Sequence, residues 1–174
     1  MNELNQHNSI IIRQAATTDA EAIQALRLEA LQRHPKAFGS DYERESGRPA
    51  SFWVERLSAQ TDSAIFVAES AGQLAGMTGI YRSELVKLRH NATIWGVYMR
   101  PQWRGQGIAV ALLQTAVNWA ERQGLNWVKL AVITNNSAAI RAYIKSGFRV
   151  YGVDPAVIRY DGVCYDEFLM ARQL

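Results

Sequence analysis

The sequence predicts a mixed α/β fold, in which one twisted sheet of six or seven strands carries helices on both faces. Three strand-like runs within residues 64–99, joined by short connections, predict an antiparallel meander. A helix over 107–122 and a strand over 127–133 follow. The order strand, helix, strand predicts a right-handed crossover, with the strand at 127–133 parallel to the last meander strand. Two closing runs complete the sheet as a hairpin. No repeat or second domain is evident.

The N-terminal part alternates strand and helix signals. β-Branched residues over 9–15 predict the first strand. Thr18 and Glu21 match the Ser/Thr-x-x-Glu capping box and predict the start of a helix that ends at Pro35. Residues 36–49 mix aromatic, glycine and charged residues without periodicity. We therefore expect a loop with a single helical turn, and loops of this length are often functional.

The later elements are predicted from apolar periodicity and turn residues. Asn135 and Asn136 are expected to cap the second long helix, and the Asp161-Gly162 pair is a strong hairpin signal. In chain order, we expect a helix at 51–58, strands at 64–69, 73–81 and 92–99, a helix at 107–122, a strand at 127–133, a helix from 137 to about 147, and closing strands at 148–153 and 163–170.

Composition places the chain among intracellular globular proteins. Its 174 residues, 48% of them hydrophobic, suit one domain, predicted at 9–174 after a disordered polar tail at 1–8. The formal net charge of +3 is too small and too scattered for a nucleic-acid binder. The single cysteine, Cys164, excludes an internal disulfide and a cysteine-cluster metal site, and we expect it to be buried in a strand. Without a signal peptide or an apolar run near 20 residues, the chain is expected to be cytoplasmic, with no membrane association.

The stretch from Val97 to Ala109, VYMRPQWRGQGIA, is the clearest candidate for a binding site. A strand breaks at Pro101 and a turn with two glycines, Gly105 and Gly107, leads into a helix. Such a turn offers bare backbone N–H groups and the positive pole of a helix to an anion, most naturally a phosphate or diphosphate. Gly107 is not followed by Lys-Ser/Thr, which argues against a P-loop, and the sixth position of a dinucleotide fingerprint holds valine.

Two spaced motifs carry a resemblance to a known family. The turn matches Gln/Arg-x-x-Gly-x-Gly/Ala, and a later segment matches Asn-x-x-Ala-x-x-x-Tyr-x-Lys-x-Gly-Phe at the expected distance. The matching residues are Gln102, Gly105 and Gly107 in the first motif and Asn136, Ala139, Tyr143, Lys145, Gly147 and Phe148 in the second. With the same order of elements from about residue 10 to the C-terminus, the chain resembles the GNAT superfamily of N-acetyltransferases.

The resemblance implies a binding site for acetyl-CoA as co-substrate, with no metal. The strands that end at Met99 and begin near Trp127 would splay apart, and the pantetheine arm would enter between them, pairing with the first like an added strand. The turn would hold the diphosphate through main-chain N–H groups. The residues implied in cofactor binding are Val97, Tyr98, Met99, Gln102, Arg104, Gly105, Gln106, Gly107, Ile108, Ala109, Asn136 and Lys145.

The resemblance also implies the chemistry. An acceptor amine would attack the thioester directly, with a backbone N–H near Val97 or Tyr98 polarising the acetyl carbonyl. Tyr143 would be the catalytic acid, protonating the departing thiolate, since a tyrosine with a pKa of about 10 is a suitable proton donor. The closing strands of this fold often form a homodimer, which we expect here by analogy.

The acceptor is expected to be a primary amine of a small molecule or an amino-acid-like compound. Residues expected near it are Phe38, Tyr42, Glu45, Tyr81 and Glu84, together with the aromatics Trp95 and Tyr98. Candidates for a general base are Asp41, Glu45, Glu84 and His90. A role as protein or peptide N-acetyltransferase is disfavoured, because members with that role usually carry glutamate where this chain has Ala131. A non-catalytic acyl-CoA-binding module and a general nucleotide binder are the remaining alternatives.

Overall fold

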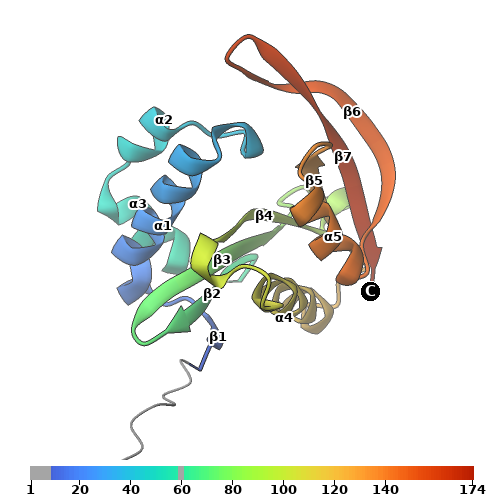
Figure 1. Ribbon diagram of the computed structural model, residues 1–174. Helices are drawn as coiled ribbons and strands as arrows, with labels where there is room; N and C mark the ends of the chain where they lie inside the picture. Colours follow the sequence, from blue (N-terminus) through green and yellow to red (C-terminus); the bar gives the residue numbers. More distant parts are fainter. Residues whose placement is uncertain (1–8, 59–60) are drawn as a thin grey trace, which may run out of the picture.

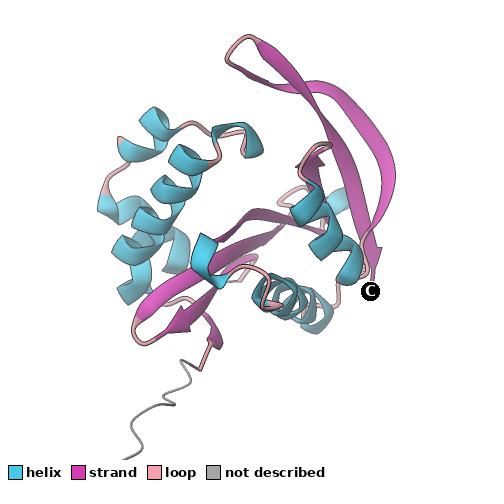
Figure 2. Ribbon diagram, in the orientation of Figure 1, coloured by secondary structure: helices cyan, strands magenta, loops and turns pink. Residues whose placement is uncertain are grey.

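The computed structural model describes residues 9–58 and 61–174, and the tail predicted at 1–8 lies outside them. Figures 1 and 2 show one sheet with helices packed on both sides. Its strands are β1 (Ile11–Gln14), β2 (Ser63–Ser70), β3 (Gln73–Arg82), β4 (Asn91–Met99), β5 (Trp127–Ile133), β6 (Arg149–Tyr160) and β7 (Val163–Gln173). The α-helices are α1 (Ala20–Arg33), α2 (Tyr42–Ser46), α3 (Ala50–Ser58), α4 (Ile108–Arg122) and α5 (Ser137–Lys145).

The sheet has seven strands in the order β1-β2-β3-β4-β5-β7-β6. All neighbouring pairs are antiparallel except β4 and β5, which are parallel and connected through α4. The predicted meander, crossover and closing hairpin are therefore confirmed. The predicted loop at 36–49 contains the one-turn helix α2, also as expected. Among the described residues, no helix is long and apolar enough to cross a membrane.

Two separate hydrophobic cores cover the two faces of the sheet. β2 is buried on both faces, so its residues alternate between the cores. Phe66 belongs to the core under α4, together with Leu112 and Val128, whereas Ile65 and Val67 belong to the core under α1 and α3. Figure 1 shows this division, with α1 and α3 on one side of β2–β4 and α4 on the other. The fold thus consists of two lobes that share one sheet.

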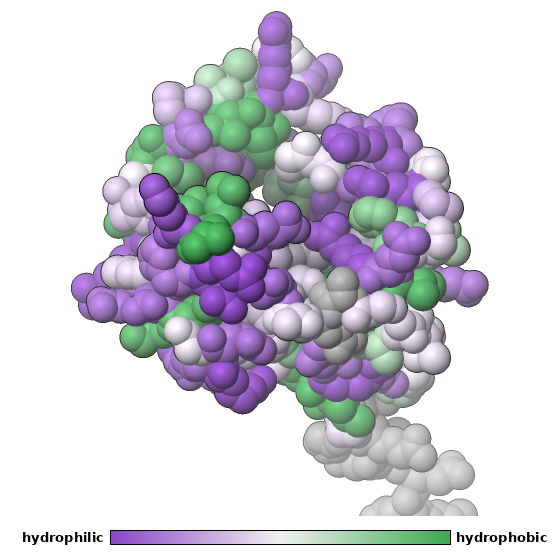
Figure 3. Space-filling view, turned by 180° about the vertical axis from the view of Figure 1, so that it is seen from behind, coloured by the Kyte–Doolittle hydropathy of each residue, from purple (hydrophilic) through white to green (hydrophobic). Residues whose placement is uncertain are grey.

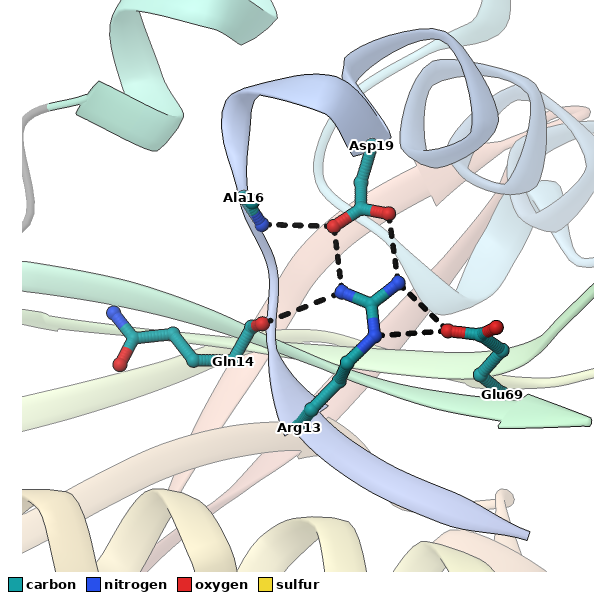
Figure 4. A network of polar contacts seen from close by, with 5 residues as sticks. All are labelled: Arg13, Gln14, Ala16, Asp19 and Glu69. Atoms are coloured by element: carbon teal, nitrogen blue, oxygen red, sulfur yellow. Dashed lines mark hydrogen bonds and ion pairs between the residues drawn. The ribbon is translucent and has the colours of Figure 1, made fainter. Parts of the chain in front are cut away.

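The predicted capping box at the start of α1 is wrong. Thr17–Asp19 form a 3₁₀ turn and α1 begins at Ala20, so Thr18 does not cap the helix. Asp19 has other partners, because its carboxylate accepts the Ala16 N–H at 2.8 Å and two bonds from the Arg13 guanidinium at 2.7 and 2.8 Å. Arg13 also donates to Glu69 of β2 at 2.8 Å (Figure 4). This network joins β1, the helix entry and β2.

The closing hairpin is longer than the sequence predicts. β6 continues to Tyr160 although Pro155 cannot donate a ladder hydrogen bond, because β6 is the edge strand and a register shift between Asp154 and Ile158 accommodates it. Ala156, at φ +54, donates its N–H to the Asp166 carboxylate at 2.8 Å instead. Figure 1 shows the hairpin extending beyond the body of the molecule.

Cys164 is exposed, and the expectation of a buried residue is wrong. It pairs with Arg159 near the tip of the hairpin, where no second layer packs on the strands. In the view from behind, hydrophobic residues coloured green gather over this hairpin (Figure 3). Exposed apolar side chains there include Tyr151, Val153 and Val163, with 58%, 55% and 52% of their surface accessible.

Candidate functional site

A cavity of about 480 Å³ opens where β4 and β5 separate. The two strands pair only over their first three residues, ending at Thr93 opposite Lys129. Beyond this point, residues 94–99 of β4 and 130–132 of β5 line opposite walls of the cavity. The splay expected between the central strands is therefore confirmed, and it leaves strand edges available to an extended ligand.

A bulge in β4 shapes one wall of the cavity. Gly96 and Val97 together lie opposite a single residue of β3, and Gly96 has a φ of +63°, a conformation that favours glycine. On β3, a Cβ built at Gly79 would lie 2.1 Å from the indole of Trp95. The absence of a side chain at Gly79 thus lets Trp95 lie against β3 where it lines the cavity.

The glycine turn forms the end of the cavity towards α4. Gly105 and Gly107 have φ values of +77° and +79°, and a Cβ built at either would meet no heavy atom within 4 Å. Both glycines line the cavity, and the turn leads directly into the N-terminus of α4 at Ile108. Free N–H groups and the helix pole favour an anion by about 0.3 to 1 kcal/mol for each charge interaction.

Tyr143 lines the cavity from α5, with 6% of its surface accessible. The side chain of Asn136 caps this helix by accepting the Ala139 N–H at 3.2 Å, as predicted for a helix start. The Tyr143 ring packs against Phe148 with centroids 6.2 Å apart, and its hydroxyl makes no hydrogen bond to any described residue. Burial raises the pKa of Tyr143 above its ordinary value, so its hydroxyl stays protonated at neutral pH.

The cavity brings together most of the residues implied in cofactor binding. Gln102 and Gln106 do not line it, and Gln106 Nε2 instead donates to the Gln102 carbonyl oxygen at 3.2 Å. Arg104 is held in place because its Nε donates to the Met99 carbonyl oxygen at 2.9 Å. The implied residues that line the cavity are Val97, Tyr98, Met99, Arg104, Gly105, Gly107, Ile108, Ala109, Asn136 and Lys145.

Of the residues expected near the acceptor, Phe38, Trp95 and Tyr98 line the cavity. Tyr42, Tyr81 and Glu84 lie outside its walls, and Glu45 is buried where its carboxylate accepts from Arg48 Nε at 3.1 Å. The base candidates Asp41 and His90 are not among the lining residues either. Ala131 does line the cavity, so the β5 wall carries no carboxylate at that position.

His34 is a lining residue that the sequence did not reveal. Its Nε2 accepts from Arg104 Nη2 at 2.9 Å, a contact between residues 70 positions apart. Burial, with Arg104 and Arg33 nearby, lowers the pKa of His34, so the imidazole is neutral at pH 7. No local pattern around His34 predicts this contact, because it depends on how α1 packs beside the glycine turn.

These features define a class of site: a splayed pair of parallel strands that leads from an open anion turn to a buried tyrosine. The profile of the acetyltransferase (GNAT) family matches residues 23–148. The chain belongs to this family and is an acetyltransferase. Among the described residues, no three His, Cys, Asp or Glu side chains lie close enough together to hold a metal ion.

Relatives match over nearly the whole chain. L-amino acid N-acetyltransferase AaaT of Escherichia coli is 26% identical over 95% of this chain and 98% of its own length. The L-methionine sulfoximine/L-methionine sulfone acetyltransferase of Pseudomonas aeruginosa is 26% identical over 86% of each chain. A structure of yncA from Salmonella typhimurium, solved with its cofactor acetyl-CoA, superposes with a TM-score of 0.84 at 24% identity over 95% of this chain and 94% of that one.

Proposed function

We propose that this protein transfers the acetyl group of acetyl-CoA to the primary amine of a small-molecule or amino-acid-like acceptor. The observation that carries the proposal is the cavity between β4 and β5, which joins an open anion turn to a buried tyrosine hydroxyl. The relatives named for L-amino acids and for methionine sulfoximine favour an acceptor of amino-acid type.

Acetyl-CoA fits the walls that this chain provides. The diphosphate binds at the turn of Gly105 and Gly107, which lines the cavity beside the N-terminus of α4. The pantetheine arm lies along the unpaired edge of β4 at Val97 and Met99, as an added strand would. This arrangement leaves the thioester beside Tyr143, at the inner wall of the cavity.

The reaction is a direct transfer. The neutral acceptor amine attacks the thioester carbonyl, the C–S bond breaks, and the acetyl group becomes an amide. A backbone N–H near Val97 or Tyr98 polarises the carbonyl oxygen. Tyr143 donates its proton to the coenzyme thiolate as it leaves, and the burial of Tyr143 keeps that proton in place until the sulfur takes it. The amine loses its own proton to solvent or to the resulting tyrosinate.

An acceptor screen that monitors release of the coenzyme A thiol tests the proposal. The panel includes L-amino acids, amino-acid amides, polyamines, aminoglycosides and short peptides with free N-termini. Turnover of small amines with little turnover of peptides is the expected result, and preferred turnover of peptides would favour a peptide N-acetyltransferase. Tight binding of coenzyme A without turnover of any amine would contradict the proposed reaction. Competition by ATP or NAD at the turn would contradict the proposed donor.

A further inference from the structure

Arg27 is a buried cation that the proposed reaction does not use. It lies on the inward face of α1 beside Ile23 and Leu26, with only 6% of its surface accessible. Its guanidinium makes no hydrogen bond and no ion pair with any described residue, and its Nη1 is fully enclosed without a partner. Buried guanidinium groups are normally paired, since their desolvation is costly. A buried and unpaired guanidinium therefore calls for an anion that the chain itself does not supply.

The nearest carboxylate of the chain does not meet this need. Glu45 attracts Arg27 through space, but its carboxylate is engaged by Arg48. Arg56 also lies close to Glu45 and is itself partly desolvated, which lowers its pKa. Three guanidinium groups thus share one carboxylate. We call Arg27, Arg48 and Arg56 the arginine cluster, and its excess charge is positive.

The arginine cluster adjoins the cavity through two aromatic walls. The Cζ atom of Arg27 lies 4.7 Å from the ring centroid of Phe38 and 6.0 Å from that of Trp95. Arg56 lies over the same Trp95 ring at 4.1 Å. Phe38, Trp95 and Gly96 all line the cavity, and a Cβ built at Gly96 would lie 3.9 Å from Arg27 Nη1. Arg27 is therefore directly behind the β4 bulge, on the α1 side of the proposed acetyl-transfer site.

We propose that Arg27 binds a carboxylate of the acceptor, so that the substrates of this enzyme are amines that carry a carboxylate, such as free amino acids. The proposal rests on the proposed function and narrows it. A guanidinium matches a carboxylate in charge and in planar geometry, and pairs of this kind are strongest where water is excluded. Arg27 itself is not a lining residue, and Phe38 and Trp95 lie between it and the cavity, so the acceptor carboxylate would reach the guanidinium between these two rings.

Matched acceptors test the proposal in the whole enzyme. Each L-amino acid of a panel is assayed beside its carboxamide and its decarboxylated amine, for example L-methionine, L-methioninamide and 3-(methylthio)propylamine, with acetyl-CoA as donor. Rates are corrected for the fraction of neutral amine, which is larger in the amide. Because a site built to hydrogen-bond a group rejects analogues that lack it, we expect kcat/KM to be higher for the amino acid by roughly 10²-fold or more.

Variants then assign the preference to one residue. Arg27→Gln should lower kcat/KM for the amino acid by roughly 10²-fold, mainly through KM, and leave the decarboxylated amine within a few-fold of wild type. Arg27→Lys should retain part of the preference, because it keeps the charge but loses the planar fork. Arg122→Gln is the matched control, since Arg122 is exposed at the far end of α4. Thermal unfolding and coenzyme A affinity of each variant separate a folding defect from a binding defect.

The outcomes separate the two proposals. Equal turnover of acids, amides and amines by the wild-type enzyme would overturn the role of Arg27 and leave the acetyl-transfer proposal intact. A carboxylate preference that survives in folded Arg27→Gln would also overturn it. Release of no thiol with any amine would refute the proposed function, and the inference with it.

Discussion

Replacing Tyr143 with phenylalanine isolates the chemical role of one hydroxyl group. The ring packs edge-on against Phe148, and the hydroxyl makes no hydrogen bond to the described residues, so phenylalanine keeps every packing contact. Removing an unpaired hydroxyl from a buried site changes the free energy of unfolding by less than about 1 kcal/mol. The variant should therefore fold and bind coenzyme A as the wild-type enzyme does.

The expected loss lies in turnover. A positioned general acid typically contributes a factor of roughly 10² to 10⁴. At 1.36 kcal/mol for each tenfold, this corresponds to about 2.7 to 5.4 kcal/mol of transition-state stabilisation. Burial raises the pKa of Tyr143, so the hydroxyl remains the proton-bearing form across pH 6–9. The ratio of wild-type to variant kcat should accordingly be constant over that range.

The assay measures thiol release at saturating acetyl-CoA. Calorimetry gives the affinity for coenzyme A, and thermal unfolding checks that the variant folds. Tyr151→Phe is the matched control, because it removes an exposed hydroxyl from β6. A kcat of Tyr143→Phe within threefold of wild type would refute the role of Tyr143 as the acid. If the ratio of wild-type to variant kcat instead falls to one between pH 7 and pH 9, the hydroxyl ionises in that range and burial does not keep it protonated.

Three further predictions concern the cofactor turn, the acid limit of stability and self-association. Gly107→Val places a side chain in the open turn at a φ of +79°, which costs about 1 to 2 kcal/mol. Calorimetry should show coenzyme A binding weakened at least tenfold, and unchanged affinity would exclude the turn as the diphosphate site. Arg13 lowers the pKa of the Asp19 carboxyl in the folded state. The Arg13–Asp19 pair therefore stabilises the folded protein fully above the unfolded pKa of 3.8, and this stabilisation is lost as pH falls through the lower, folded pKa. In urea unfolding, Asp19→Asn should lose about 1 kcal/mol at pH 7 and show a shallower decline below pH 4, and an unchanged acid slope would contradict the linkage. We expect a homodimer through β6 and β7, where Tyr151 is exposed. In analytical ultracentrifugation, Tyr151→Glu should give monomers. A monomeric wild-type protein would exclude this interface.

The sequence predicts the elements whose signals are local. The crossover through α4 and the hairpin at Asp161 follow from apolar periodicity and turn chemistry, and both are present. The start of α1 could not be predicted in the same way. Asp19 binds Arg13 and the Ala16 N–H, and Arg13 in turn reaches Glu69 on another strand. The partners of Asp19 are three and six residues away, in a 3₁₀ turn that the Thr18 and Glu21 pattern does not describe.

The candidate site likewise contains residues with local sequence signals and residues whose position depends on tertiary contacts. The glycine turn was predicted from backbone conformation within a short segment and Tyr143 from the matched family motif, and both line the cavity. On the acceptor side, the aromatics Phe38, Trp95 and Tyr98 were predicted, but the charged residues were not. Glu45 pairs with Arg48, and His34 meets Arg104 only through the packing of α1. Arg27 gives no signal at all, since an arginine on a helix is normally solvated and only tertiary structure buries it.

The cofactor side and the acceptor side of the cavity are built on different cores of the fold. The cofactor wall is made largely of backbone groups from β4 and the glycine turn, and it packs with the core under α4. The arginine cluster and Phe38 belong to α1, α3 and the segments between them, over the other core. Arg27 and Arg56 lie over Trp95 of β4, so substitutions at these two residues are expected to couple to the β4 wall. Substitutions elsewhere in α1 and α3 leave the packing under α4 untouched, so acceptor selectivity can vary there while Tyr143 keeps its geometry.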